Sequence, residues 1–249
     1  MELIRVLVLN YAGLDVEDFT EGVKALQHQV SADFGPAWNV EAELIEVACP
    51  QAIGERQYPC HWALVLLDRR RDYGDEPSPV LGYHDLTRKG LPLAKVFVDR
   101  VPEGQDWVHV ASHELLEMLA DPDVTATVYE HPDALTVLLY AREVCDPCAA
   151  YGDGYRVRNR QVSDFVLPAW FSRGATARSV EQFDRRGLIH HPFEIRPGGY
   201  IGVFDPAVSA WRIAGSGDDL DEPRHEGTRL ERRSTAGNRL RTSDLIWHP

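Results

Sequence analysis

Hydrophobic residues in the first half of the chain fall into short apolar runs separated by one amphipathic segment. Continuous or alternating apolar residues predict strands at 2–10, 40–49, 62–68 and 94–99, and the run VLGYHDL at 80–86 precedes the last of them. Between the first two strands, apolar residues recur at helical spacing, at Val16, Phe19, Val23, Leu26 and Val30. Asp15 is placed to cap this helix, and Gly35 lies beyond its expected end.

A second helix is predicted over 106–121. Its apolar residues line one side, at Val108, Ala111, Leu115, Met118 and Leu119. A polar stripe runs along another side, at Asp106, His109, His113, Glu117 and Asp121. The order of strand, helix, several strands and helix predicts an α/β (α+β) fold, in which helices pack on a mixed sheet.

The pattern is less regular after Pro122. The segment 134–146 fits a strand or a helix, and 155–171 predicts short strands broken at Pro168. Two apolar runs around Asp205-Pro206 predict a hairpin. Few apolar residues follow Gly215, which predicts a flexible tail. We therefore expect an N-terminal subdomain at 1–122, a smaller C-terminal subdomain at 123–214 and a tail at 215–249.

Charge and hydropathy narrow the range of partners. The 249 residues carry a net charge of −13, which argues against a nucleic acid or an anionic membrane as a partner, since both require a basic surface. We find no apolar stretch long enough for a transmembrane helix and no signal-peptide core. The sequence thus predicts a cytoplasmic protein.

Four cysteines leave their role open. Cys145 and Cys148 have the C-x-x-C spacing of a metal knuckle, whereas Cys49 and Cys60 are spaced more loosely. A structural zinc site made of all four thiolates is one interpretation. Buried thiols without a metal are the alternative that we favour.

The segment VHVASHELLEMLAD, at 108–121, carries the candidate chemistry. His113 and Glu117 are one helical turn apart and can point at a common centre, as two metal ligands must. Glu114 lies about 100° around the axis, where it can reach a water molecule at that centre without binding the ion. A surface helix that happens to expose a histidine and two glutamates is the alternative interpretation.

The HExxE run at 113–117 resembles the HExxH motif of zincin-type metallopeptidases, and the resemblance covers about residues 1–145. It implies a twisted sheet, an edge strand near GYHDL or AKVFVD and an active-site helix. His113 would be the first metal ligand, Glu114 the general base and Glu117 the second ligand. The chain also resembles uncharacterised bacterial and phage proteins that share SHEL.E...DP, E..D.C, VSDFV.PAWF and GGY segments. These stand here at 112–122, 143–148, 162–171 and 198–200.

The third ligand is chosen by comparison with zincin subgroups. A downstream glutamate is the third ligand in gluzincins, and Glu143 fits that pattern. Asp123 fits the metzincin spacing, but the glycine and the Met-turn of metzincins are missing. Asp121 is a further candidate, although its position beside Pro122 suits the end of the helix better. We prefer Glu143.

Four other residues are candidates for stabilising an oxyanion, as a tyrosine or histidine often does in zincins: Tyr155, His190, His191 and Tyr200. His109 lies one turn before His113, and we expect it to be a structural histidine of the helix rather than a ligand.

One histidine and two carboxylates leave a Zn²⁺ centre neutral, so water bound there should be less acidic than in efficient zinc hydrolases. Such an oxygen-rich set also accepts Mn²⁺ or Ca²⁺. We expect a zinc-dependent hydrolase, most simply a metallopeptidase whose peptide substrate lies along the edge strand. The alternative is a non-catalytic zincin-like protein with a structural ion or none.

Overall fold

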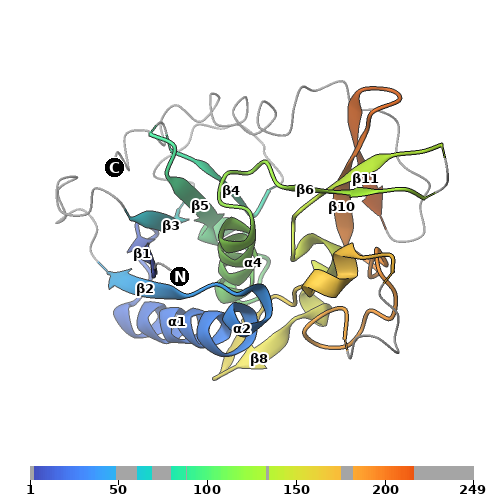
Figure 1. The fold of residues 1–249 in the computed structure, drawn as a ribbon. Coiled ribbons are helices and arrows are strands. Elements are labelled where there is room, and N and C mark those ends of the chain that lie inside the picture. Colours follow the sequence, from blue (N-terminus) through green and yellow to red (C-terminus); the bar gives the residue numbers. More distant parts are fainter. Residues whose placement is uncertain are drawn as a thin grey trace.

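The computed structural model describes residues 3–48, 61–68, 80–87, 89–132, 135–174 and 182–215, and these form an α+β fold (Figure 1). The larger sheet has five strands in the order β2 (Ala42–Val47), β1 (Ile4–Asn10), β3 (Trp62–Leu67), β5 (Pro92–Phe97) and β4 (Gly82–Leu86). The first four strands are parallel, and β4 runs antiparallel to β5 at the edge. The predicted fold class and the four predicted strands are confirmed.

The first helix begins where the sequence predicts. The Asp15 side chain caps α1 (Val16–His28) by accepting hydrogen bonds from two backbone N–H groups, those of Glu17 and Asp18. The end predicted at Gly35 is wrong, because the chain continues through the π-helix η1 (Gln29–Phe34) into α2 (Gly35–Trp38). Asn39 ends it in the left-handed conformation, with φ of 56°, a role that asparagine can take in place of glycine.

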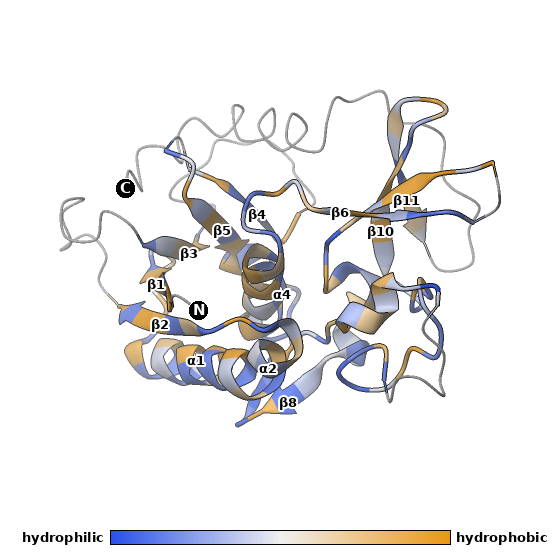
Figure 2. Cartoon of the chain, in the orientation of Figure 1, coloured by the Kyte–Doolittle hydropathy of each residue, from blue (hydrophilic) through white to orange (hydrophobic). Residues whose placement is uncertain are grey.

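The second predicted helix is α4 (Trp107–Ala120), capped by the Asp106 side chain. Its apolar face packs into the main core as expected, but much of the polar stripe is also covered: His109, Glu117 and Asp121 are all buried. The interpretation as a surface helix is therefore wrong. Figure 2 shows more hydrophobic residues on α4 than on α1, in agreement with its central position between the two sheets (Figure 1).

The second half forms a smaller antiparallel sheet in the order β11 (Ala210–Gly215), β10 (Tyr200–Asp205), β7 (Leu138–Ala141) and β6 (Thr127–Glu130). The predicted hairpin at Asp205-Pro206 is confirmed as β10 and β11, and the ambiguous segment 134–146 contains strand β7. A short hairpin joins β8 (Tyr155–Val157) to β9 (Arg160–Val162). Four 3₁₀ turns complete the described structure: η3 (Val98–Arg100), η4 (Asp146–Cys148), η5 (Tyr151–Asp153) and η6 (Pro168–Phe171).

One apolar core joins the two halves, since its buried members include Val8 of β1, Leu115 of α4 and Val203 of β10. The division into subdomains at residue 122 stays a prediction, and the predicted tail lies outside the described residues, apart from Gly215. Among the helices that the structure describes, none combines the length and the apolar character needed to cross a bilayer.

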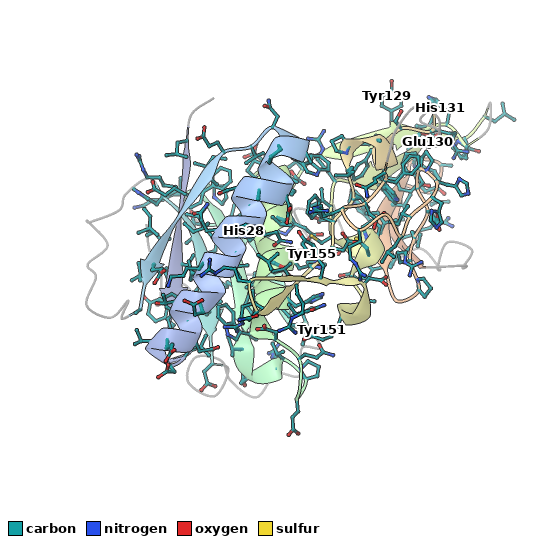
Figure 3. The ribbon with its side chains drawn as sticks, turned by 90° about the horizontal axis from the view of Figure 1, so that it is seen from below. His28, Tyr129, Glu130, His131, Tyr151 and Tyr155 are labelled. Carbon is teal, nitrogen blue, oxygen red and sulfur yellow. The ribbon has the colours of Figure 1, made fainter. Side chains whose placement is uncertain are left out.

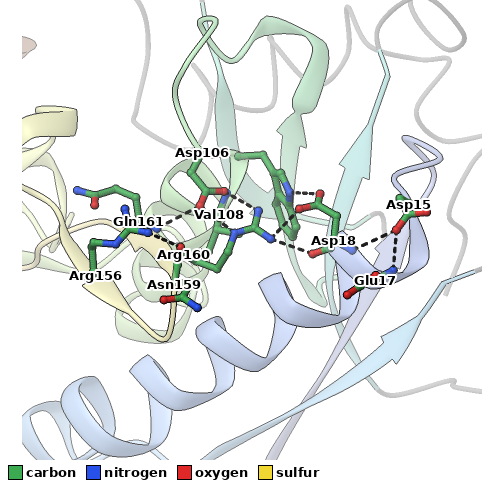
Figure 4. A network of polar contacts seen from close by, with 10 residues as sticks. Asp15, Glu17, Asp18, Asp106, Val108, Arg156, Asn159, Arg160 and Gln161 are labelled. Carbon is green, nitrogen blue, oxygen red and sulfur yellow. Dashed lines mark hydrogen bonds and ion pairs between the residues drawn. The ribbon is translucent and has the colours of Figure 1, made fainter.

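An ion-pair network fixes the start of α4 (Figure 4). The Arg160 guanidinium on β9 donates two hydrogen bonds to the Asp106 carboxylate, at 2.8 and 2.6 Å, and one to the Asp18 carboxylate of α1, at 2.8 Å. The other Asp18 oxygen accepts a hydrogen bond of 2.9 Å from the Trp107 indole. The cap of α4, the start of α1 and the β8–β9 hairpin are thus held by one arginine.

Candidate metal centre

Glu117 is the centre of the polar groups that α4 carries. Its Oε1 lies 3.5 Å from His113 Nε2, one turn earlier on the helix, so the predicted pair does converge. The backbone N–H of Cys145 donates a hydrogen bond of 3.2 Å to the same oxygen. Because Glu117 is buried, this hydrogen bond rather than water orients its carboxylate.

The first group of candidate ligands consists of His113, Glu117 and Asp146, whose ligand atoms lie within 4.8 Å of one another. Asp146 comes from the 3₁₀ turn η4, and its Oδ1 lies 3.2 Å from His113 Nε2. The His113 side chain is 12 % exposed, whereas that of Glu117 is 3 % exposed. This group therefore has an imidazole at its solvent side and carboxylates behind it.

The second group consists of His84, Glu117 and Glu143, all buried. His84 lies on the edge strand β4, with its Nδ1 3.5 Å from Glu117 Oε2 and its Nε2 3.4 Å from Glu143 Oε2. Glu117 belongs to both groups, and each of its oxygens faces a different imidazole.

The structure thus divides the predicted set of ligands. His113 and Glu117 share one group, and its third member is Asp146. Glu143 belongs to the other group, together with Glu117 and His84. His84 and Asp146 were not among the ligands predicted from the sequence. Asp146 stands in the E..D.C segment quoted above for the resemblance, so a signal for it was present. His84 has no such signal, because a single histidine in a strand is unremarkable.

The spacing of these atoms suits a shared cation. Two donor atoms about 2.1 Å from one ion at the tetrahedral angle lie about 3.4 Å apart. The His113–Glu117 and His84–Glu117 distances of 3.5 Å match this value, whereas Glu143 lies 3.4 Å from the other ring nitrogen of His84. They exceed the length of a charge-assisted hydrogen bond, about 2.7–2.9 Å. The donor set, imidazole nitrogen with carboxylate oxygen, can hold a divalent ion such as Zn²⁺ or Mn²⁺.

The charges around Glu117 shift two pKa values upward. Burial and the nearby charges of Asp146 and Glu143 raise the pKa of Glu117 well above its ordinary value. Burial alone would lower the pKa of His113, but the neighbouring carboxylates, chiefly Glu117 and Asp146, raise it well above its ordinary value. Without a cation, the pair therefore binds protons more tightly than the two isolated side chains would.

The affinity for a divalent cation should consequently increase with pH. A cation binds only the ionised form of Glu117 and the neutral form of His113, so it displaces the protons that the raised pKa values retain. We expect the apparent affinity for Zn²⁺ to rise between about pH 5 and pH 8, by about tenfold per pH unit for each proton released. Calorimetric titration in buffers of different ionisation enthalpy measures both quantities. An affinity that is constant over this range, with no proton release, would contradict the expectation.

Glu114 lies beside both groups. It is buried, and its Oε2 lies 3.6 Å from His84 Nδ1. Gly82 of β4 gives it room, because a Cβ atom at position 82 would come within 2.8 Å of Glu114 Cγ. The close approach of β4 to α4 thus places a carboxylate next to the candidate ligands.

Of the four candidates for oxyanion stabilisation, Tyr200 is the one at the site, where its hydroxyl is hydrogen-bonded to Asp146. The charge of Asp146, burial of the hydroxyl and the charge of Glu117 raise the pKa of Tyr200 above its ordinary value, so the phenol stays protonated. Although Tyr200 as a residue is 41 % exposed, its hydroxyl faces the carboxylates.

The other three candidates lie elsewhere. Tyr155 donates a hydrogen bond of 2.8 Å to Asp33, and Figure 3 shows it near the middle of the view, apart from Tyr129 and His131. His190 and His191 are exposed, and their backbone N–H groups donate to the Glu194 carboxylate.

The remaining polar residues of the helix are structural. Burial lowers the pKa of His109 to about 4, so its ring, packed 4.9 Å from that of Tyr151, is neutral. Asp121 accepts hydrogen bonds from the backbone N–H groups of residues 125 and 126, and so braces the turn after α4 as expected. Asp123 is exposed and belongs to neither candidate group of the described residues.

Cys145 and Cys148 are free, buried thiols. Burial, with the neighbouring charges of Glu117 and Asp164 respectively, raises both pKa values, so the thiols stay protonated. Cys49 and Cys60 lie outside the described residues, and a site made of all four thiolates stays untested. A surface cavity lined by Leu3, Val30, Pro36 and Val40 lies where α2 meets β2 and includes none of the candidate ligands.

Comparison of the chain with models of known protein families, with curated proteins and with solved structures finds no significant match.

Proposed function

We propose that this protein is a metal-dependent hydrolase of the zincin type and that its substrate is a peptide. The observation that carries the proposal is the arrangement on α4. His113 and Glu117 offer ligand atoms one turn apart, Asp146 completes the group, and Glu114 places a carboxylate next to it. A bound Zn²⁺ or Mn²⁺ would polarise the scissile carbonyl and increase the acidity of water.

The arrangement of the larger sheet supports a zincin interpretation. The family resemblance implies a twisted sheet with an edge strand that precedes the active-site helix, and β4 is the strand at that edge among the described strands. It contributes His84 and contacts Glu114 through Gly82. The edge strand and the helix thus meet at the candidate site.

In the proposed reaction, Glu114 accepts a proton from the attacking water and passes it to the amine that leaves. A carboxylate suits this role because it can accept a proton and release it again near neutral pH. The Tyr200 hydroxyl stays protonated, and by turning from Asp146 it would donate its one hydrogen bond to the carbonyl oxygen as negative charge develops there. His113, Glu117 and Asp146 hold the cation in place for both steps.

A peptide is the substrate that β4 fits best. The free edge of a sheet pairs with an extended chain through backbone hydrogen bonds, which do not depend on the side chains of the substrate. A peptide along β4 would pass the position where His84 and Glu114 lie. Its scissile bond would then be within reach of the base.

The proposal is tested by digestion of a mixed peptide library, with products identified by mass spectrometry. The chelated protein should be inactive, and addition of Zn²⁺ or Mn²⁺ should restore cleavage. The control is His190→Ala, which changes an exposed histidine outside the site and should cleave as the wild type does. Cleavage that persists after complete chelation, or that never occurs with any divalent metal, would contradict the proposal.

The burial of Glu117, Glu143 and His84 favours a second candidate function, in which the ion stabilises a non-catalytic protein. In that case chelation would lower the melting temperature, and the metal-loaded protein would cleave no peptide of the library.

A further inference from the structure

Glu117 joins two groups of candidate ligands that face opposite oxygens of one carboxylate. Oε1 faces His113 and lies in the group completed by Asp146, whereas Oε2 faces His84 and lies in the group completed by Glu143. A single ion at the first group would leave the second imidazole and the second carboxylate unused. Carboxylates that bridge two metal ions present their oxygens in this divided way.

The distances around His84 favour a ligand over a charged hydrogen-bond donor. If His84 were an imidazolium between two carboxylates, its N···O distances should be about 2.7–2.9 Å. They are 3.5 Å to Glu117, 3.4 Å to Glu143 and 3.6 Å to Glu114. The Nδ1–Glu117 distance is close to the separation of about 3.4 Å expected for two ligands of one tetrahedral ion, whereas Glu143 faces the other ring nitrogen, Nε2.

The total charge of the groups around Glu117 also favours a second cation. Four carboxylates, those of Glu114, Glu117, Glu143 and Asp146, are buried close to the two imidazoles. Buried carboxylates cost several kcal/mol each unless they are paired or bind metal. With the imidazoles neutral, one divalent cation would balance two of the four negative charges, and two such cations would balance all of them.

We propose that His84, Glu117 and Glu143 hold a second divalent cation, and that Glu117 bridges it to the ion held by His113 and Asp146. The second ion is one that accepts a nitrogen and two oxygens, such as Zn²⁺ or Mn²⁺. In two-metal sites of this kind the ions lie about 3.5–4 Å apart. The inference goes beyond the proposed hydrolase activity and does not depend on it.

Equilibrium binding of Mn²⁺ to the full-length, chelator-treated protein tests the proposal. The wild type should bind two ions per chain, His84→Ala should bind one, and the control His190→Ala should bind two. Electron paramagnetic resonance gives a second readout that is independent of activity. Two bridged Mn²⁺ ions couple magnetically, so the spectrum of isolated Mn²⁺ should be weak in the loaded wild type and should appear at full intensity in loaded His84→Ala.

Because His84 is buried, Glu143→Gln provides a second variant that keeps the volume of the side chain and removes its charge. It should also bind one ion, with an unchanged circular dichroism spectrum. A wild type that binds one ion and matches both variants in stoichiometry would overturn the bridged pair while leaving the first site intact. A wild type that binds no ion would overturn both sites. Neither result depends on whether any peptide is cleaved.

Discussion

Glu114→Gln should lower kcat for peptide cleavage by at least about a hundredfold, within the range of about 10²–10⁴ that a positioned general base contributes. Glutamine fills the same volume against Gly82 but cannot accept the proton of the attacking water. Since Glu114 is not a member of either candidate ligand group, the metal content should stay at the wild-type value. The measurement combines initial rates with elemental analysis of the same sample.

The matched control for this variant is Glu103→Gln, which changes an exposed glutamate in the turn before α4. It should retain the full rate. Two results would contradict the assigned role of Glu114. One is a Glu114→Gln variant with the wild-type rate, and the other is a variant that loses its metal together with its activity, which would make Glu114 a ligand.

Arg160→Ala should reduce the free energy of unfolding by about 2–3 kcal/mol, less than the cost of about 3–5 kcal/mol for removing one partner from a fully buried ion pair. The Arg160 side chain is 13 % exposed, and that of its partner Asp106 is 17 % exposed, so the Asp106 carboxylate would stay mostly buried without a cation. Asp18 is 44 % exposed, and water would solvate its carboxylate instead. Asp106 is also the cap of α4, so the start of the site helix should fray. Urea denaturation followed by circular dichroism measures the loss.

Arg156→Ala is the control, because Arg156 is exposed on the same hairpin and its guanidinium donates to a backbone oxygen nearby. Its stability should differ from that of the wild type by less than about 1 kcal/mol. Equal midpoints for the two arginine variants would show that the network in Figure 4 contributes little to stability.

The fold of the first half is largely readable from the sequence, because its elements are long and regular in their hydrophobic pattern. Strand β1 and helix α4 were predicted to within two residues at each end. The end of α1 was not predicted correctly. Glycine often ends a helix, but here Gly35 lies within a continuing helix. Its neighbours explain this: a Cβ atom at position 35 would come within 2.8 Å of two carbonyl oxygens, so close backbone packing requires glycine there.

The part of the site that lies on helix α4 can also be predicted from the sequence. His113, Glu114 and Glu117 are fixed relative to one another by the geometry of one helix, which needs no knowledge of the rest of the fold. The ligands from outside the helix depend on tertiary structure. Glu143 and Asp146 stand in one short segment, and the spacing along the chain does not say which of them reaches His113.

His84 illustrates the limit most clearly. Its contribution arises because β4 reverses direction at the edge of the sheet and lies against α4. In sequence it is one histidine between Tyr83 and Asp85, a context that carries no sign of a ligand. Tyr200 could be named from the sequence only as one of four candidates, since its hydroxyl reaches Asp146 because β10 packs beside η4.

We infer that His113, Glu117 and Asp146 bind a divalent cation. Anomalous X-ray diffraction at the zinc edge, from crystals of the full-length protein grown with Zn²⁺, locates such an ion directly. We predict an anomalous peak about 2.0–2.2 Å from His113 Nε2, Glu117 Oε1 and Asp146 Oδ1. The absence of a peak within bonding distance of these three atoms, in crystals that contain zinc, would contradict the claim.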